Sequence, residues 1–413
     1  MENWREYTRV ENNLKPKVSI LGPYFAGDGV ANHIRNIVPY LSERFDLRIV
    51  SVGPTTRHVK QESLDIVQHS IPFPIHIGIQ SRLTTLLMSA TECRGTRLFH
   101  LHDPLLSVIR EVYRTTPVVA TVHGTLSTER MLRSGRREKF TEDIVRRIEL
   151  TTYRMCDVLI VVHRELYDVL TQRYCVPARK IVMIPNGVNP EKFKPDNAAR
   201  RSVRMKLGVR DDEFLVSCFK TLPKDDVETV VEAFALMLSK KAKIRLLVPW
   251  RDKSVRLHDI FAKNLLESRV ILLDSIPYED MNGFYNAADV NIIPSLKGSY
   301  FGGFASREIS DLKTACNLGY ASATNLTVME SLATATPTIV TLSTSKAEFL
   351  VNDIAVTVPS GSPKALADAT LHLMNERANA KILGNNARKF VKDNFTWARI
   401  ANRTADLYHQ TLS

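Results

Sequence analysis

Short apolar runs separated by polar turns recur along the chain, and each predicts a buried strand. In the first half these runs lie at 17–21, 47–50, 98–102, 118–122, 158–162 and 181–184. In the second half they lie at 214–218, 244–248, 270–273 and 290–293. The second half therefore repeats the plan of the first.

Helical periodicity fills the gaps between these runs. Apolar residues recur with helical spacing from Val30 to Phe45, and Pro39 inside this pattern is expected to kink or divide the helix. A charged helix is expected at about 137–155, an amphipathic helix at 227–238, and a final helix from Trp397 onward. The first strand, its glycine turn, the helix and the next strand form a βαβ unit, which opens a Rossmann-like domain.

A chain of 413 residues suggests about two domains. The polar, charged stretch 194–212 reads as a linker, so we expect one domain at 1–195 and another at 196–395. The fold class is α/β, with two doubly wound Rossmann-like halves facing a central crevice. We expect the terminal helix, 396–413, to pack back toward the first domain. Ligands bind at the carboxyl ends of strands in such halves, so both sites would face the crevice.

Composition narrows the class of protein. No run of eighteen uncharged apolar residues exists, and the charged amino end lacks the apolar core of a signal peptide. The five cysteines are dispersed and odd in number, which favours reduced thiols in a cytoplasmic protein over disulfides or a zinc site.

The net charge of +12 favours nucleic acids, anionic lipid head groups or diphosphate-bearing substrates as partners. No nucleic-acid module with interleaved aromatic and basic residues stands out, so we predict no nucleic-acid partner. The basic segment 130–147 fits peripheral contact with an anionic membrane. Glutamates and Asp143 are interspersed in it, and a solvated helix face is the alternative.

The stretch from Asn325 to Thr341 carries the strongest chemical signal. It predicts a helix start with one carboxylate, Glu330, then a break at Pro337 and a short strand. A helix start holds phosphate on its free backbone amides, and a carboxylate accepts hydrogen bonds from ribose hydroxyls. An ordinary buried helix is the alternative interpretation.

Several segments, in order, resemble the retaining glycosyltransferases of family 4 with the GT-B fold. They are 27–29, 100–104, 121–124, 184–195, 285–295 and 325–341, with 395–397 before the last helix. The resemblance implies transfer of a sugar from a nucleotide-sugar to an acceptor with retention at the anomeric carbon. It places the donor in the second domain and an acceptor, lipid-linked or small, in the first. It also implies no bound metal and no cofactor beyond the nucleotide diphosphate sugar, as co-substrate.

The resemblance assigns roles residue by residue. Glu330 would bind the ribose, and the helix start at Leu326 and Thr327 would face the diphosphate. Lys220 and Lys224 stand where the family clamps the diphosphate with an arginine and a lysine five apart, so the register differs here. Two solvated lysines are the alternative to that clamp.

The first domain supplies the remaining implied contacts. His123 would contact the donor sugar, and Gly27 and Gly29 would permit close approach of the diphosphate or the acceptor. His100 and His102 point to one face of their strand. No third ligand at metal spacing follows them, so we expect a structural or acceptor-lining role.

The chain also departs from the family. Ser322 stands where members usually carry another glutamate, and an insertion at 296–321 offers Glu308 or Asp311 as the missing carboxylate. Pro249-Trp250-Arg251 replaces an expected glycine pair. These changes leave open a catalytically degraded homologue that binds a sugar or a partner. A nucleotide-sugar epimerase or a glycosyl phosphorylase on the same fold is a further alternative.

Overall fold

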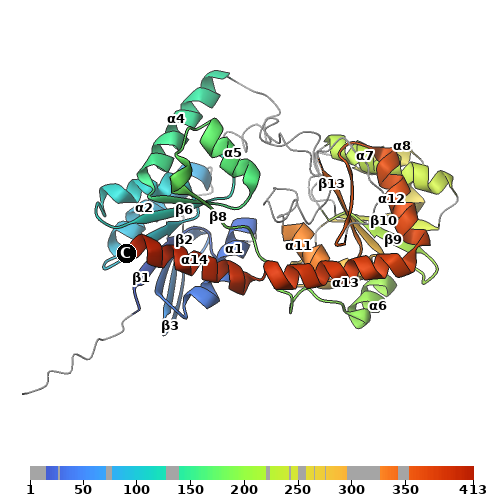
Figure 1. Ribbon diagram of the computed structural model, residues 1–413, viewed down its shortest axis with the longest axis horizontal. Helices are drawn as coiled ribbons and strands as arrows, with labels where there is room; N and C mark the ends of the chain where they lie inside the picture. The colour runs from blue at the N-terminus through green and yellow to red at the C-terminus, as the bar shows by residue number, and fades with distance from the viewer. Residues whose placement is uncertain are drawn as a thin grey trace, which may run out of the picture.

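The protein folds into two lobes, each built on one β-sheet (Figure 1). The computed structural model describes residues 15–26, 28–70, 77–126, 139–219, 224–240, 243–249, 257–264, 266–274, 276–294, 326–342 and 353–413. Two doubly wound α/β halves of GT-B type are therefore present, as the spacing of apolar runs predicted.

The first sheet has eight strands in the order β3-β4-β2-β1-β5-β6-β7-β8. Their bounds are β1 Lys17–Leu21, β2 Asp46–Gly53, β3 Arg57–Gln61, β4 Leu64–Ser70, β5 Leu98–Leu101, β6 Val118–Val122, β7 Val158–Val161 and β8 Ile181–Met183. All neighbours are parallel except β3 and β4, which form an antiparallel pair at one edge. This edge pair was not predicted from the sequence, because β3 is exposed throughout and carries no apolar run.

Helices cover both faces of this sheet. One face carries α2 (Ile77–Glu92), the 3₁₀ helix η1 (Pro104–Glu111), α4 (Lys139–Met155) and α5 (Arg164–Gln172), whose apolar side chains share one cluster. The short η2 (Ala178–Lys180) precedes β8. The other face carries α1 (Gly29–Leu41) and the last helix, α14 (Trp397–Leu412). The carboxyl end of the chain thus completes the core of the first lobe.

Of the two effects expected of Pro39, a kink or a division, the division is wrong, because α1 is one continuous helix. Asp28 caps its start, with the side chain accepting from the Ala31 amide at 2.8 Å. Pro39 lies in the last turn, where only the bond from its missing amide is lost. Burial of Ile34, Ile37 and other apolar residues against the sheet holds the helix together around it.

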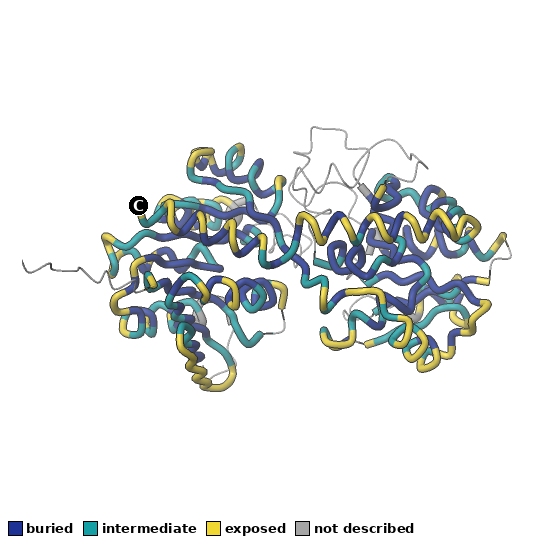
Figure 2. Tube along the Cα trace, turned by 60° about the horizontal axis from the view of Figure 1, so that its bottom comes forward, coloured by how far each residue is buried: buried dark blue, intermediate teal, exposed yellow. Residues whose placement is uncertain are grey.

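The second sheet has six parallel strands in the order β11-β10-β9-β12-β13-β14. Their bounds are β9 Phe214–Ser217, β10 Ile244–Pro249, β11 Val270–Leu273, β12 Val290–Ile293, β13 Thr338–Leu342 and β14 Val356–Pro359. The helices are α6 Asn197–Lys206, α7 Lys224–Ser239, α8 Leu257–Lys263, η3 Glu267–Arg269, α9 Met281–Ala287, α11 Leu326–Ala333, α12 Pro363–Asn375 and α13 Arg377–Asn394. In Figure 2 the strands of both lobes are mostly buried, while the helices expose one side.

The stretch that read as a linker contains a docked helix. Within 194–212, helix α6 packs on α9, and the Arg204 side chain is buried. Arg204 donates to Asp289 at 3.2 Å and to the carbonyls of Ala287, Arg210 and Glu213. The polar composition of α6 therefore reflects an ion-paired contact with the second lobe, which apolar periodicity did not reveal.

Two chain segments connect the lobes and touch each other. Val188 pairs with Thr396 in an isolated parallel bridge, and the Val188 amide donates to the Phe395 carbonyl at 2.7 Å. Gly187 lies in close contact with Trp397. A β-carbon added to this glycine would lie 2.8 Å from the indole ring. In Figure 1, α13 runs along the second lobe and α14 along the first. The terminal helix thus packs on the first lobe.

Candidate functional site

Glu330 lies buried on α11 with both carboxylate oxygens hydrogen-bonded. Tyr278 donates its hydroxyl to Oε1 and Tyr285 donates to Oε2, each at 2.9 Å. Burial raises the pKa of Glu330 to about 7, while the two tyrosine hydrogen bonds and the charge of Lys192 lower it. The carboxyl group is therefore close to half-ionised at neutral pH. The two tyrosine hydroxyls hold it in place.

Local sequence fixes α11 in this place. Its apolar residues, among them Val328, Met329 and Leu332, are buried in a cluster under β12 and β13. Ser331 adds a polar anchor, since its hydroxyl accepts from Asn291 at 2.8 Å and bonds Thr338 at 2.7 Å. The first residues of α11, Leu326 and Thr327, are only partly buried.

The start of α11 meets the first lobe. A β-carbon added to Gly29 would lie 3.9 Å from Leu326 Cδ1, and Leu326 packs against the apolar cluster of the first lobe. The Asn32 side chain on α1 lies near Tyr278 and lowers the pKa of its hydroxyl, which burial raises. The glycine turn of the first lobe and the carboxylate helix of the second therefore lie at one junction.

Two basic side chains border this junction. Arg35 of α1 donates to the carbonyls of Tyr24 and Ala26, at 2.5 and 2.7 Å, and so holds the turn that precedes α1. Lys192 places its ammonium 3.6 Å from the centroid of the Tyr278 ring. Burial lowers the pKa of Lys192, although Glu330 opposes that shift. Lys192 thus places positive charge near Glu330, and the charge of Arg35 acts on Lys192 and Tyr278.

Four histidines gather where the first-sheet strands end. His102 Nδ1 lies 3.0 Å from His123 Nε2, and His33 Nδ1 lies 3.0 Å from Asn186 Oδ1. His100 bonds Thr121 at 2.7 Å and the hydroxyl of Tyr408. This last pair of contacts gives His100 a structural role.

The histidines are neutral at physiological pH. Burial lowers the pKa of His33 to about 4 and that of His100 to about 3. Burial also holds the pKa of His102 and of His123 well below the usual range, and the nearby histidines lower both further. Each ring therefore offers one donor and one acceptor, rather than a positive charge.

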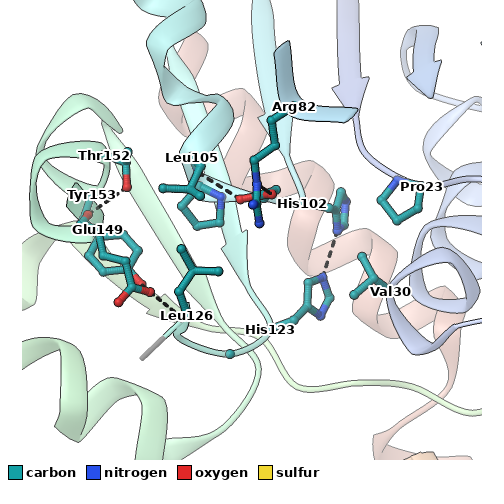
Figure 3. Close-up of a pocket in the computed structure, with 13 residues that line it drawn as sticks. Pro23, Val30, Arg82, His102, Leu105, His123, Leu126, Glu149, Thr152 and Tyr153 are labelled. Atoms are coloured by element: carbon teal, nitrogen blue, oxygen red, sulfur yellow. Dashed lines mark hydrogen bonds and ion pairs between the residues drawn. The ribbon is translucent and has the colours of Figure 1, made fainter. Parts of the chain in front are cut away.

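A pocket of about 200 Å³ opens beside this cluster (Figure 3). Its walls come from α1, α2, η1, α4 and the ends of β5 and β6, and they include Pro23, Val30, Arg82, His102, Asp103, Leu105, His123, Gly124, Leu126, Glu149, Thr152 and Tyr153. The His102 Nε2 atom is buried there without a hydrogen-bond partner among the described residues. An unpartnered buried nitrogen in a pocket is a ready contact for a ligand hydroxyl.

The two carboxylates of the pocket wall, Asp103 and Glu149, are both bound by neighbouring protein groups. Asp103 pairs with Arg82 at 2.5 Å and accepts from the Leu105 amide at 3.0 Å. Glu149 accepts from the Leu126 amide and the Tyr174 hydroxyl, both at 2.6 Å. Glu149 thereby fixes the chain just after His123, as the dashed line in Figure 3 shows.

The structure brings some of the predicted site residues together. Glu330, Leu326, Thr327 and Gly29 meet at the junction between the lobes, and His123 lines the neighbouring pocket. Lys224 begins α7, with a side chain outside the description. The remaining predicted residues lie outside the described part of the chain: Gly27, Lys220, Glu308, Asp311 and Ser322, with Trp250 and Arg251 of the segment that replaces the glycine pair.

Sequence reasoning missed Asn32, Arg35, Lys192 and Tyr278, because each joins the site only through tertiary contact. It also missed His33, which continues the histidine cluster from α1. Among the described residues, no group of three or more His, Cys, Asp or Glu is arranged to hold a metal ion. None of the described helices is both long and apolar enough to cross a bilayer.

Comparison with known proteins agrees with this geometry. Residues 27–192 match the family described as Glycosyltransferase Family 4, and residues 200–390 match Glycosyl transferases group 1. An uncharacterized glycosyltransferase of Methanocaldococcus jannaschii is 22% identical over 263 residues, which cover 63% of this chain and 61% of that protein. The match thus spans less than two thirds of that relative.

Solved structures share the fold over nearly the whole chain. Sucrose-phosphate synthase from Thermosynechococcus elongatus superposes with a TM-score of 0.70 at 19% identity, covering 96% of this chain and 99% of that one. An Anabaena protein solved with UDP-glucose superposes with a TM-score of 0.68 at 14% identity, covering 95% and 99%. At these identities the likeness establishes the fold.

Proposed function

The chain belongs to the glycosyltransferases of family 4 type with the GT-B fold, and on this premise we propose that it transfers a hexose from a nucleoside diphosphate sugar to an acceptor with retention at the anomeric carbon. One observation carries the proposal: Glu330 lies on a helix whose start meets the glycine turn of the opposite lobe. A helix start binds a diphosphate on its backbone amides, and a carboxylate accepts hydrogen bonds from ribose hydroxyls.

The donor is proposed to bind across this junction. Its diphosphate lies at the amides of Leu326 and Thr327, where the helix dipole favours negative charge. Its ribose hydroxyls donate to Glu330, where they displace or share the hydrogen bond from Tyr278 to one carboxylate oxygen. Lys220 and Lys224 are assigned to the diphosphate as point charges. This arrangement stabilises the charge that develops on the leaving group without a resident metal.

The sugar is proposed to face the pocket of the first lobe. His123, neutral at physiological pH, serves there as a hydrogen-bonding partner of the sugar, and His102 Nε2 serves the acceptor side. In transfer, the acceptor oxygen bonds to the anomeric carbon as the carbon–diphosphate bond breaks. The acceptor proton passes to the departing phosphate oxygen. Attack from the face that the diphosphate leaves accounts for retention.

The cellular setting is also a proposal. Among the described residues, Cys93 and Cys156 are buried free thiols, and Cys175 is an exposed one. Unpaired thiols suit a reducing compartment, so we place the reaction in the cytoplasm.

A panel of nucleotide-sugars tests the proposed function. Purified protein is incubated with each member, and its thermal shift and the nucleoside diphosphate released are measured. A donor at about a hundred times its dissociation constant adds about 2.7 kcal/mol of stability. We expect nucleotide-sugars with one particular base to stabilise the protein, and we expect the sugar to be released slowly from that nucleotide. No shift and no release with any donor would contradict it and favour a binding subunit without catalysis.

A further inference from the structure

Exposed aliphatic side chains concentrate on one layer of the first lobe. The described residues include eleven large hydrophobic residues that are exposed, and six of them lie on α2, on α4 and on or just after η1. These six, which we call the outer apolar face, are between 44% and 67% exposed: Leu83, Leu87, Val108, Val112, Ile144 and Ile148. The other five are scattered over α1, β3, α6, α7 and α13.

The three elements form a continuous layer. Helix α2 packs against η1, and η1 packs against α4. On α4, Arg146 reaches the Arg173 carbonyl on the α5 side, at 3.5 Å. Ile148 lies two residues further, about 200° around the helix, and so on the side toward η1. The six exposed aliphatic side chains therefore lie on three neighbouring elements of one layer.

Positive charge accompanies the outer apolar face. Arg94, Arg114, Arg147 and Arg154 are exposed at or between its elements, and none has an ion pair among the described residues. Among the residues of these elements whose exposure is described, the exposed carboxylates are Glu111 and Asp143, and Asp143 lies 3.9 Å from Arg146. Aliphatic side chains interspersed with unpaired arginines are the composition that anionic lipid surfaces bind.

The face adjoins the acceptor-side pocket. Arg82 in the pocket wall precedes Leu83 of the face, and Thr152 follows Ile148 by one helical turn. Figure 1 shows α2 and α4 on the same lobe, and Figure 3 shows the pocket between them. A surface held at this face would therefore lie beside the pocket.

We propose that the outer apolar face docks on an anionic lipid bilayer, so that the neighbouring pocket receives an acceptor carried by a lipid of that bilayer. The identity of the pocket as the acceptor side rests on the proposed function, whereas the docking itself does not. A second copy of the chain fits this face less well. In a two-fold contact the four arginines would face a copy of the same basic surface, on which the described residues offer only Glu111 and Asp143 as exposed carboxylates.

Vesicle sedimentation tests the proposal with the full chain. Vesicles of phosphatidylcholine alone are compared with vesicles that also contain phosphatidylglycerol, at low and at high salt. We expect binding to the anionic vesicles only, weakened by salt. Because the assay contains neither donor nor acceptor, its failure leaves the proposed transfer reaction standing, and failure of transfer leaves vesicle binding standing.

Matched variants locate the contact. Leu83→Ser with Leu87→Ser should lower anionic-vesicle affinity about tenfold or more, and Arg114→Gln with Arg147→Gln about 30-fold, at roughly fivefold per arginine. The controls are Met205→Ser with Ile382→Ser and Arg201→Gln with Arg399→Gln, which change equally exposed positions elsewhere. All variants should keep the wild-type thermal transition, since the changed side chains are exposed. Absence of wild-type binding, equal losses in the controls, or a wild-type dimer that the leucine changes dissociate would each overturn the proposal.

Discussion

The hydroxyl of Tyr278 lies 2.9 Å from Glu330 Oε1, which places a tyrosine where a ribose hydroxyl is expected to bind. Tyr278 reaches this position from the segment after β11 and lies near Asn32 of the opposite lobe, which lowers the pKa of the Tyr278 hydroxyl against the effect of burial. The same tyrosine therefore links the proposed ribose-binding carboxylate to the first lobe. Donor binding at Glu330 must displace or share this hydrogen bond.

The first prediction follows from that competition. Tyr278→Phe removes the hydroxyl and leaves Glu330 Oε1 free for the ribose. We expect nucleoside diphosphate affinity to rise about three- to tenfold, since one hydrogen bond is worth about 1 kcal/mol. Calorimetry at about pH 9, where Glu330 is ionised, separates this effect from protonation. Weaker binding by the variant would mean that Tyr278 contacts the donor itself.

The second prediction concerns pH. The pKa of Glu330 is about 7 in the folded protein against an ordinary value of 4.5, because the group is buried. Between these values the folded state holds a proton that the unfolded state has lost. The Glu330 contribution to the free energy of unfolding should thus fall by about 3 kcal/mol as pH rises from about 4.5 to about 7.

Donor affinity should change in the opposite direction, because the ionised carboxylate is the better acceptor for ribose hydroxyls. Calorimetric titrations from about pH 5.5 to about pH 8.5 should show affinity rising through an apparent pKa near 7. In Glu330→Gln the Glu330 contribution to the pH dependence of stability and the rise in donor affinity should both be absent. Identical pH profiles in the two proteins would show that Glu330 does not titrate in this range.

The third prediction concerns the histidines. The pKa of His33 is lowered to about 4, so the unfolded chain takes up a proton on this group below about pH 6.5 while the folded chain does not. Stability should therefore be lost as pH falls through this window, by about 1 kcal/mol from His33 between about pH 7.5 and about pH 5.5. Urea denaturation of wild type and His33→Gln at both values measures the loss. An equal loss in the two proteins would contradict it.

The fourth prediction concerns the two lysines assigned to the diphosphate. Replacing Lys220 and Lys224 with alanine should weaken binding of the nucleoside diphosphate about tenfold or more, since each is a charge-assisted contact. The nucleoside alone should bind as it does to wild type. Equal losses for the two ligands would mean that the pair acts indirectly.

Much of the fold was predictable because it is encoded locally. Val118–Val122 and Val290–Ile293 are strands at the predicted bounds, since an uninterrupted apolar run defines a buried strand by itself. The continuity of α1 past Pro39 was not predictable from the pattern, because packing of the whole helix outweighs one lost bond.

The candidate site was also predictable from the sequence only in part. The placement of Glu330 near the start of a helix was predicted, because helix start, carboxylate and following strand are contiguous in the chain. Its partners were not, since Tyr278 lies 52 residues away in sequence and Asn32 belongs to the other lobe. Contacts of this kind depend on how the two lobes close, which no local pattern records.

The fifth prediction tests the central claim, that Glu330 binds the ribose of the donor. Calorimetry measures the affinities of wild type and Glu330→Gln for the nucleoside diphosphate that the panel identifies and for its 2′,3′-dideoxy analogue. Wild type should prefer the ribonucleotide by about ten- to a hundredfold, the value of a charge-assisted hydrogen bond of about 1.5–3 kcal/mol. Glu330→Gln should lose most of this preference while binding the dideoxy analogue as wild type does. The same preference in both proteins would contradict the account.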